Sequence, residues 1–146
     1  MKTLTIFILF VSSLCLAQTQ INVTDSLGKK QGHWVVIGKM KPNATAYLPN
    51  QLIEEGYYKD NRKTGVWKEY YSNGNQKNEL NFENGRPSGK AIMYHENGCI
   101  KEEGNWKNNR WYGTYKSYNE KEELMEQRVF DEKGKISGSR TNCITL

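Results

Sequence analysis

The chain is built on a 24-residue period, and this period constrains its fold more than any other feature of the sequence. Aromatic residues recur with this step, at Tyr58, Phe82, Trp106 and Phe130. Further columns keep the same register, and they comprise Gly65, Gly89 and Gly113, then Tyr70, Tyr94 and Tyr118, and the pair Asn73-Gly74 repeated as Asn97-Gly98. Four columns with one period predict stacked copies of a single supersecondary unit.

The period divides the chain into repeats of unequal completeness. Residues 56–79, 80–103 and 104–127 form three full units, and residues 128–138 form a partial fourth unit. Residues 18–55 form a degenerate first copy, in which Gly32 and Trp34 align with Gly65 and Trp67 once nine inserted residues are placed in Lys39–Asn50. Atypical end copies are expected in a stacked array, because terminal repeats must cap it. Residues 139–146 are left as a C-terminal tail.

Each unit predicts two strands. Residues 66–71 are a short aromatic and β-branched run, and Asn73-Gly74 predicts a tight turn, because both residues tolerate positive φ. The other connection, residues 83–89, is expected to be longer, and the Gly65 column is expected to mark positive φ or a close backbone approach. The predicted fold class is therefore all-β, an elongated antiparallel sheet of stacked 24-residue β-hairpin repeats.

The composition suits a thin sheet whose rings supply the packing. Hydrophobic residues make up only 36% of the chain, and its mean hydropathy is −0.83. It nevertheless carries 4 Trp, 9 Tyr and 4 Phe residues, and such rings bury much area per residue.

The first residues read as a cleaved signal peptide rather than as part of the fold. A lysine at position 2 precedes an apolar run from Leu4 to Leu14, and small residues stand at positions 15 and 17. This pattern predicts cleavage after Ala17 and a secreted or periplasmic protein. An uncleaved membrane anchor is the alternative. A lipoprotein with an acylated Cys15 is disfavoured, because Leu14 stands where a small residue is needed.

Two cysteines, Cys99 and Cys143, remain after such a cleavage. An oxidising compartment permits a disulfide between them. The sequence does not establish that their Cα atoms approach each other, so a disulfide and two unpaired thiols both stay open.

No set of residues predicts chemistry, and the chain is expected not to be an enzyme and to need no cofactor or metal. The two histidines, His33 and His95, fall in different columns of the repeat. Glu102 and Glu103 are adjacent on a predicted strand, so they point to opposite faces and cannot share one task. No nucleophile elbow or phosphate-cradling loop occurs.

The charges indicate no nucleic-acid partner. The chain has 21 basic and 16 acidic residues, and their signs alternate along the sequence rather than clustering on one segment. The excess of basic residues lies near the two ends. We interpret most of these charges as a solvated surface, with association with a membrane surface as an alternative.

The repeats resemble the MORN-type repeat, in the variant form found in bacterial YwqK-type antitoxin family chains. The resemblance rests on Gly65-Val66-Trp67, Tyr70-Tyr71 and Asn73-Gly74 with their later copies, and it covers about residues 25–138. It departs from the pattern where Ala91 replaces the Trp67 ring and Glu122 replaces the turn glycine. The resemblance implies β-hairpins that contact proteins or lipids, with no shared catalytic residues.

Together these features predict an exported, non-catalytic repeat module that binds an unidentified protein partner at the cell envelope. An antitoxin or immunity-type protein is the alternative, and association with phospholipid surfaces is the second alternative. The oligomeric state stays open. Arg110, Trp111 and Tyr112 are the candidate contact residues, because two large rings in a connection are not needed for sheet packing.

Overall fold

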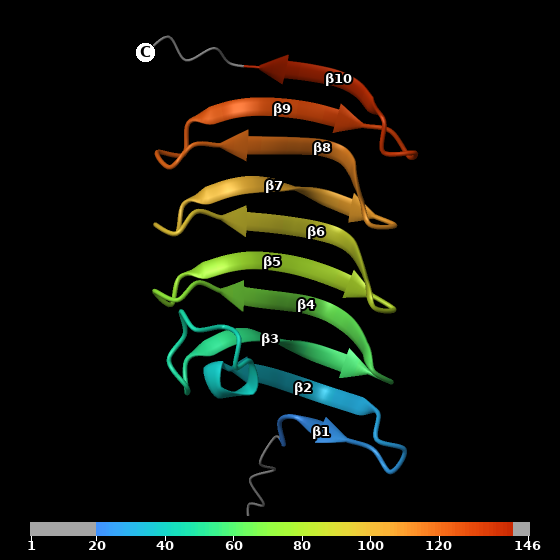
Figure 1. The fold of residues 1–146 in the computed structure, drawn as a ribbon. Helices are drawn as coiled ribbons and strands as arrows, with labels where there is room; N and C mark the ends of the chain where they lie inside the picture. Colours follow the sequence, from blue (N-terminus) through green and yellow to red (C-terminus); the bar gives the residue numbers. More distant parts are fainter. Residues whose placement is uncertain (1–19, 142–146) are drawn as a thin grey trace, which may run out of the picture.

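The computed structural model describes residues 20–141, which form one ten-stranded antiparallel sheet (Figure 1). The strands lie in chain order, each paired with the next, so the predicted all-β stack of hairpins is confirmed. A single 3-10 turn, η1, interrupts them. The elements are β1 (Val23–Thr24), β2 (Lys30–Ile37), η1 (Gly38–Met40), β3 (Leu52–Lys59), β4 (Arg62–Tyr70), β5 (Gln76–Glu83), β6 (Arg86–Tyr94), β7 (Ile100–Lys107), β8 (Arg110–Tyr118), β9 (Leu124–Phe130) and β10 (Ile136–Thr141).

The candidate signal peptide, residues 1–17, lies outside the described residues, as does Cys143. Cys99 lies directly before β7 and is partly exposed. Among residues 20–141 no helix is long and apolar enough to cross a membrane.

Two kinds of turn alternate between β3 and β9, and the sequence-based assignment of them was wrong. The two-residue turns are Asp60-Asn61, Asn84-Gly85 and Asn108-Asn109, and both residues of each have positive φ, which matches the twist of the flanking strands. Asn73-Gly74 instead lies in a longer connection, where only Gly74 has positive φ. There Tyr71 and Asn75 close a three-residue loop, with Gly74 bonded back to Tyr71.

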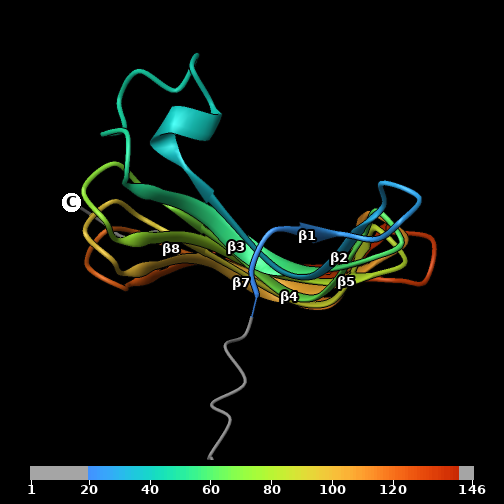
Figure 2. The ribbon, with the colours of Figure 1, turned by 90° about the horizontal axis from the view of Figure 1, so that it is seen from below.

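The strands are bent, and Figure 2 shows the sheet as a shallow trough with η1 rising from one rim. Gly65, Gly89 and Gly113 have φ of +64°, +89° and +66°, as predicted, and Gly32 has +68°. Gly65, Gly89 and Gly113 each lie beside a break in the pairing register of neighbouring strands, whereas the pairing at Gly32 is regular. Such bulges bend a strand and increase its twist, so the glycine column shapes the trough.

A row of rings along one face provides most of the packing. Tyr58 contacts Trp34 and Trp67 with ring centroids 5.6 and 4.9 Å apart, and Trp67 continues to Phe82 at 6.5 Å. A second run connects Trp106, Trp111, Tyr115 and Phe130, with centroid distances between 4.8 and 6.1 Å. These edge-on contacts are a favourable geometry for aromatic rings. The row is needed because residues 20–141 form a single sheet, with no second layer against which it could pack.

A large side chain on one strand faces a small one on the next strand, and the two sizes are exchanged between repeats, so that the row of rings stays filled. The Trp67 ring lies on Gly56, where an added Cβ would be 2.3 Å from its nearest ring atom. One repeat later the sizes are reversed, since Leu80 pairs with Ala91 and Ala91 is 1% exposed. The absence of a ring at position 91 is therefore compensated by a larger residue across the ladder.

The Ala91→Trp variant tests this exchange. We expect it to destabilise the protein by roughly 2 kcal/mol, because the indole would overlap Leu80. The double variant Leu80→Gly/Ala91→Trp recreates the pairing of Gly56 with Trp67 and should recover much of that loss. Urea unfolding of both single variants and the double variant gives the coupling energy. Additive effects of the two substitutions would contradict the exchange.

A second test concerns the loop between β8 and β9. Glu122 occupies the position of Gly74 with φ of +62°, which is strained for a residue with a Cβ. We expect Glu122→Gly to raise the free energy of unfolding by about 0.5–1 kcal/mol, and Gly74→Ala, which adds a Cβ in open space, to lower it by about 1 kcal/mol. Thermal unfolding measures both. A less stable Glu122→Gly variant would show that the turn tolerates glutamate without strain.

Candidate functional site

The connections between strands form two rows, one at each end of the strands, and the side chains of the two rows make different contacts. The β2–β3, β4–β5, β6–β7 and β8–β9 connections lie at one end of the strands, which we call the long-loop edge (Figure 1). The three two-residue turns lie at the opposite end, which we call the tight-turn edge, together with the longer β1–β2 and β9–β10 loops. The two edges therefore differ in a way that recurs with the repeat.

The polar side chains of the long-loop edge bond the repeats to one another. Tyr71 Oη donates to Tyr94 O at 2.8 Å, and His95 Nε2 lies 3.0 Å from Tyr118 O in the same column. Asn73 Nδ2 donates to Glu96 O at 2.8 Å, and the Asn97 amide repeats this bond to the next loop. His95 therefore has a packing role equivalent to that of a tyrosine.

The inserted segment after β2 joins this edge. Tyr47 Oη donates to Tyr70 O at 2.7 Å, and the Gln51 amide donates to Ser72 O. Lys41 and Lys63 each lie 2.9 Å from the Glu54 carboxylate. Burial alone would raise the pKa of Glu54, but the hydrogen bonds from the two lysines outweigh it and lower the pKa.

The tight-turn edge carries an excess of cations. Its turns with their flanking residues hold nine lysines and arginines and five acidic residues, whereas the described long-loop edge holds three cations and four acids. The cations of the tight-turn edge are Lys29, Lys30, Lys59, Arg62, Arg86, Lys107, Arg110, Lys133 and Lys135, and its acids are Asp25, Asp60, Glu83, Asp131 and Glu132.

Most of these acids already have partners. Asp25 Oδ1 and Asp131 Oδ1 each accept two backbone N–H groups of their own turns. The hydrogen bond from the Gln31 amide and then these backbone bonds lower the pKa of Asp25, and the backbone bonds lower that of Asp131. Asp60 accepts a hydrogen bond from Gln31, and Glu132 lies 3.4 Å from Lys107 Nζ. The field at this edge is therefore set by its arginines and lysines.

Arginines stand at the 24-residue period on this edge, and the sequence reading missed them. Arg62, Arg86 and Arg110 are the first residues of β4, β6 and β8. The alternating signs of neighbouring charges conceal this column in the sequence, although the three arginines are 24 residues apart. The guanidinium groups of Arg62 and Arg86 form no ion pair or hydrogen bond with any part of residues 20–141, whereas that of Arg110 donates to Lys133 O at 3.1 Å.

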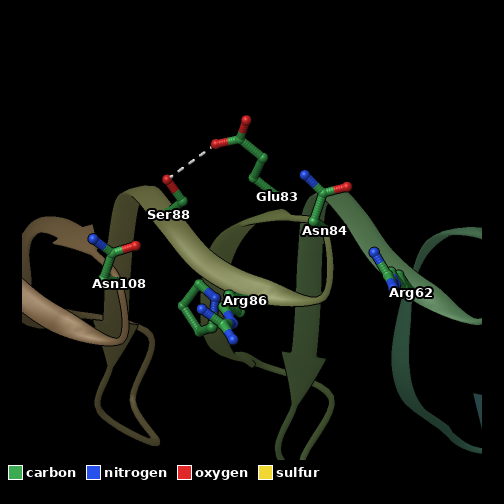
Figure 3. A pocket seen from close by; sticks show the side chains of 7 residues that line it. Arg62, Glu83, Asn84, Arg86, Ser88 and Asn108 are labelled. Atoms are coloured by element: carbon green, nitrogen blue, oxygen red, sulfur yellow. Dashed lines mark hydrogen bonds between the residues drawn. The ribbon is translucent and has the colours of Figure 1, made fainter.

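Two grooves lie between the successive tight turns. One, of about 540 Å³, is lined by Arg62, Asn84, Arg86 and Asn108 among others, and Figure 3 shows it from close by. The other, of about 500 Å³, lies on the far side of Asn84 and is lined by Lys29, Lys59 and Arg62. Both are open and polar, which suits an extended anionic ligand better than a small apolar one.

The predicted contact residues Arg110, Trp111 and Tyr112 also lie at this edge, but not in a connection. They are the first three residues of β8, because the tight turn ends at Asn109. The Trp111 ring packs between Trp106 and Tyr115, so a large ring here does serve sheet packing, contrary to the expectation from sequence. Tyr112 is 37% exposed, and Lys107 Nζ lies 5.0 Å from its ring centroid.

The described residues offer little for chemistry. Residues 20–141 contain no group of three or more His, Cys, Asp or Glu side chains that could hold a metal ion. His33 stacks on Tyr57 with centroids 5.1 Å apart and lies 3.5 Å from Glu55, far along the sheet from His95. The arrangement is suited to binding through charge and ring contacts.

Two tyrosines of one column of the repeat make the sheet less stable at alkaline pH. Burial and the hydrogen bond to Glu55 raise the pKa of Tyr70 to about 12, and burial and Glu103 do the same for Tyr118. A tyrosine in the unfolded chain ionises near pH 10. The unfolded state therefore loses its protons first, so this stabilisation is complete below pH 10 and is lost between pH 10 and 12.

The double variant Tyr70→Phe/Tyr118→Phe tests this dependence. At pH 8 we expect it to be less stable than the wild type by about 1–2 kcal/mol, because two hydrogen bonds to carboxylates are lost. At pH 11 the difference should shrink. Urea unfolding at both values measures it, and lysine deprotonation affects both proteins alike. A difference that is the same at pH 8 and pH 11 would contradict the assignment.

Comparison with known proteins identifies the repeat. A family model described as a MORN repeat variant matches residues 63–84 and 87–108. The matches begin at the second residue of β4 and of β6, cover the long loop and the next strand, and end in the following tight turn. A search of curated proteins gave no significant match.

Proposed function

We propose that this chain, a MORN-repeat protein, is an exported, non-catalytic module that binds a protein partner through its tight-turn edge. One observation carries the proposal. A column of arginines, two of them unpaired, lies along open grooves at one edge, whereas the other edge uses its polar groups to join the repeats. Guanidinium groups that have no partner within the described residues are available for a binding partner.

MORN repeats are commonly binding modules, which supports this reading of the edge. The proposed contact includes Arg110 and Tyr112, with Trp111 holding β8 in place from the ring row. Arginine and tyrosine are favoured at the centres of protein interfaces, because they combine charge or a hydroxyl with a large contact area. The proposed location is outside the cytoplasm, on the strength of residues 1–17.

Affinity capture tests the proposal. The mature chain, residues 18–146, is immobilised and exposed to an envelope extract of its own organism. We expect it to capture a specific protein, and we expect Arg110→Ala/Tyr112→Ala to lose at least roughly tenfold in affinity, since interface anchors typically contribute more than about 1.4 kcal/mol.

The matched control is Lys101→Ala/Met125→Ala. It removes one cation and one equally exposed apolar side chain, since Met125 is also 37% exposed, at the start of strands on the long-loop edge. Capture should be unchanged. Equal losses in both variants would move the site away from the tight-turn edge, and no specific capture by the wild type would contradict the binding function.

A further inference from the structure

The arginine row has a fixed spacing. Arg62, Arg86 and Arg110 begin β4, β6 and β8, so consecutive arginines are two strands apart. Strands in a sheet lie about 4.8 Å apart, which places the arginine backbones at intervals of roughly 9.5 Å. The row therefore presents arginine side chains at a regular interval along the tight-turn edge.

The turns hold the backbone and the aliphatic stem of the first arginine in place. The stem of Arg62 packs beside Gly85 of the next tight turn, where an added Cβ would lie 3.6 Å from Arg62 Cβ. Gly85 N donates to Lys63 O at 2.9 Å, and Asn61 N donates to Lys30 O at 3.2 Å, so adjacent turns are bonded to their neighbours. A guanidinium on such a support loses less entropy on binding a carboxylate in a bidentate manner.

We propose that the Arg62–Arg86–Arg110 row binds an extended acidic peptide segment of the partner, with a carboxylate at every third residue. This inference rests on the proposed function and specifies its partner. A polyproline II segment rises about 3.1 Å per residue with three residues per turn, so every third side chain points the same way at intervals of about 9.3 Å. That interval matches the arginine spacing.

Other anionic ligands match less well. A β-strand presents side chains on one face every two residues, at about 6.7 Å. A nucleic-acid strand carries a phosphate for each rise of about 3.4 Å along its axis. Lipid headgroups in a fluid bilayer have no fixed spacing. The regular interval therefore favours the peptide.

The groove between the arginines supplies the remaining contacts. The amides of Asn84 and Asn108 line it at the same period and can bond peptide carbonyls and N–H groups. Figure 3 shows Glu83 directed towards Ser88, whose Oγ lies 3.5 Å from its carboxylate, and away from Arg62 and Arg86. Glu83 lies opposite Arg86 in the strand register but forms no ion pair with it. Its negative charge nevertheless lies beside the groove and weakens the positive field there.

Two synthetic peptides of identical composition test the spacing. One repeats the unit Glu-Pro-Pro four times, and the other places its four glutamates together before the prolines. Fluorescence anisotropy with residues 18–146 measures both affinities at low and physiological salt. We expect the periodic peptide to bind about tenfold tighter or more, since each bidentate carboxylate contact is worth that factor or more.

Three variants locate the site. Arg62→Ser/Arg86→Ser should lose at least about tenfold in affinity for the periodic peptide, while Lys77→Ser/Lys101→Ser, exposed lysines 24 residues apart near the long-loop edge, should keep it. Glu83→Gln should bind severalfold tighter, because it removes the opposing charge. Near-UV circular dichroism checks that the packing of the aromatic residues is unchanged in each variant.

Equal affinity for the two peptides would overturn the inference, as would tighter binding of single-stranded DNA or of phosphatidylcholine vesicles containing phosphatidylserine. These results leave the proposed function standing if envelope capture still yields a protein that depends on Arg110 and Tyr112. Failure of the capture itself, with the periodic peptide still preferred, would count against the proposed partner while keeping the ligand chemistry.

Discussion

The contact of rings between neighbouring strands is the interaction on which the structure depends. A sheet with one layer has no facing layer to bury its apolar side, so each ring must be covered by the rings of the next strand. Trp67 illustrates this, because it is 3% exposed although it lies on an open sheet. It is covered by Tyr58 and Phe82, lies flat on Gly56, and has Lys63 Nζ at 3.9 Å from its ring centroid.

Because of this dependence, the size of a side chain is constrained more by its partner on the neighbouring strand than by its neighbours along the chain. A ring at one position requires a small residue opposite, as at Trp67 and Gly56, and a small residue permits a larger partner, as at Ala91 and Leu80. In β8 the position of Lys63 is taken by Trp111, so an aromatic side chain covers the row where a lysine covers it in β4. The repeat thus conserves the volume of the row rather than the residue types within it.

The period predicted the fold, the glycine column and the row of rings, because each of these depends on residues that recur at one step. The turns were not predictable from dipeptide signals. Asn73-Gly74 reads as a two-residue turn, yet Asn73 uses its Oδ1 to accept from Asn75 N within a longer loop. The true two-residue turns vary between Asp-Asn, Asn-Gly and Asn-Asn, so their common left-handed backbone was hidden by different side chains.

The site was only partly predictable, and for a related reason. Arg110 and Tyr112 of the proposed site were predicted because of the two large rings of Trp111 and Tyr112, whereas nothing beside Arg62 or Arg86 in the sequence drew attention to them. Charge alternation along the sequence argues for a solvated surface, but a strand meander places the start of every second strand on one edge. Charges that are 24 residues apart in sequence then lie in one row, two strands apart. The electrostatic character of a meander is therefore set by its columns, and a chain with balanced charge in each repeat can still present one cationic edge.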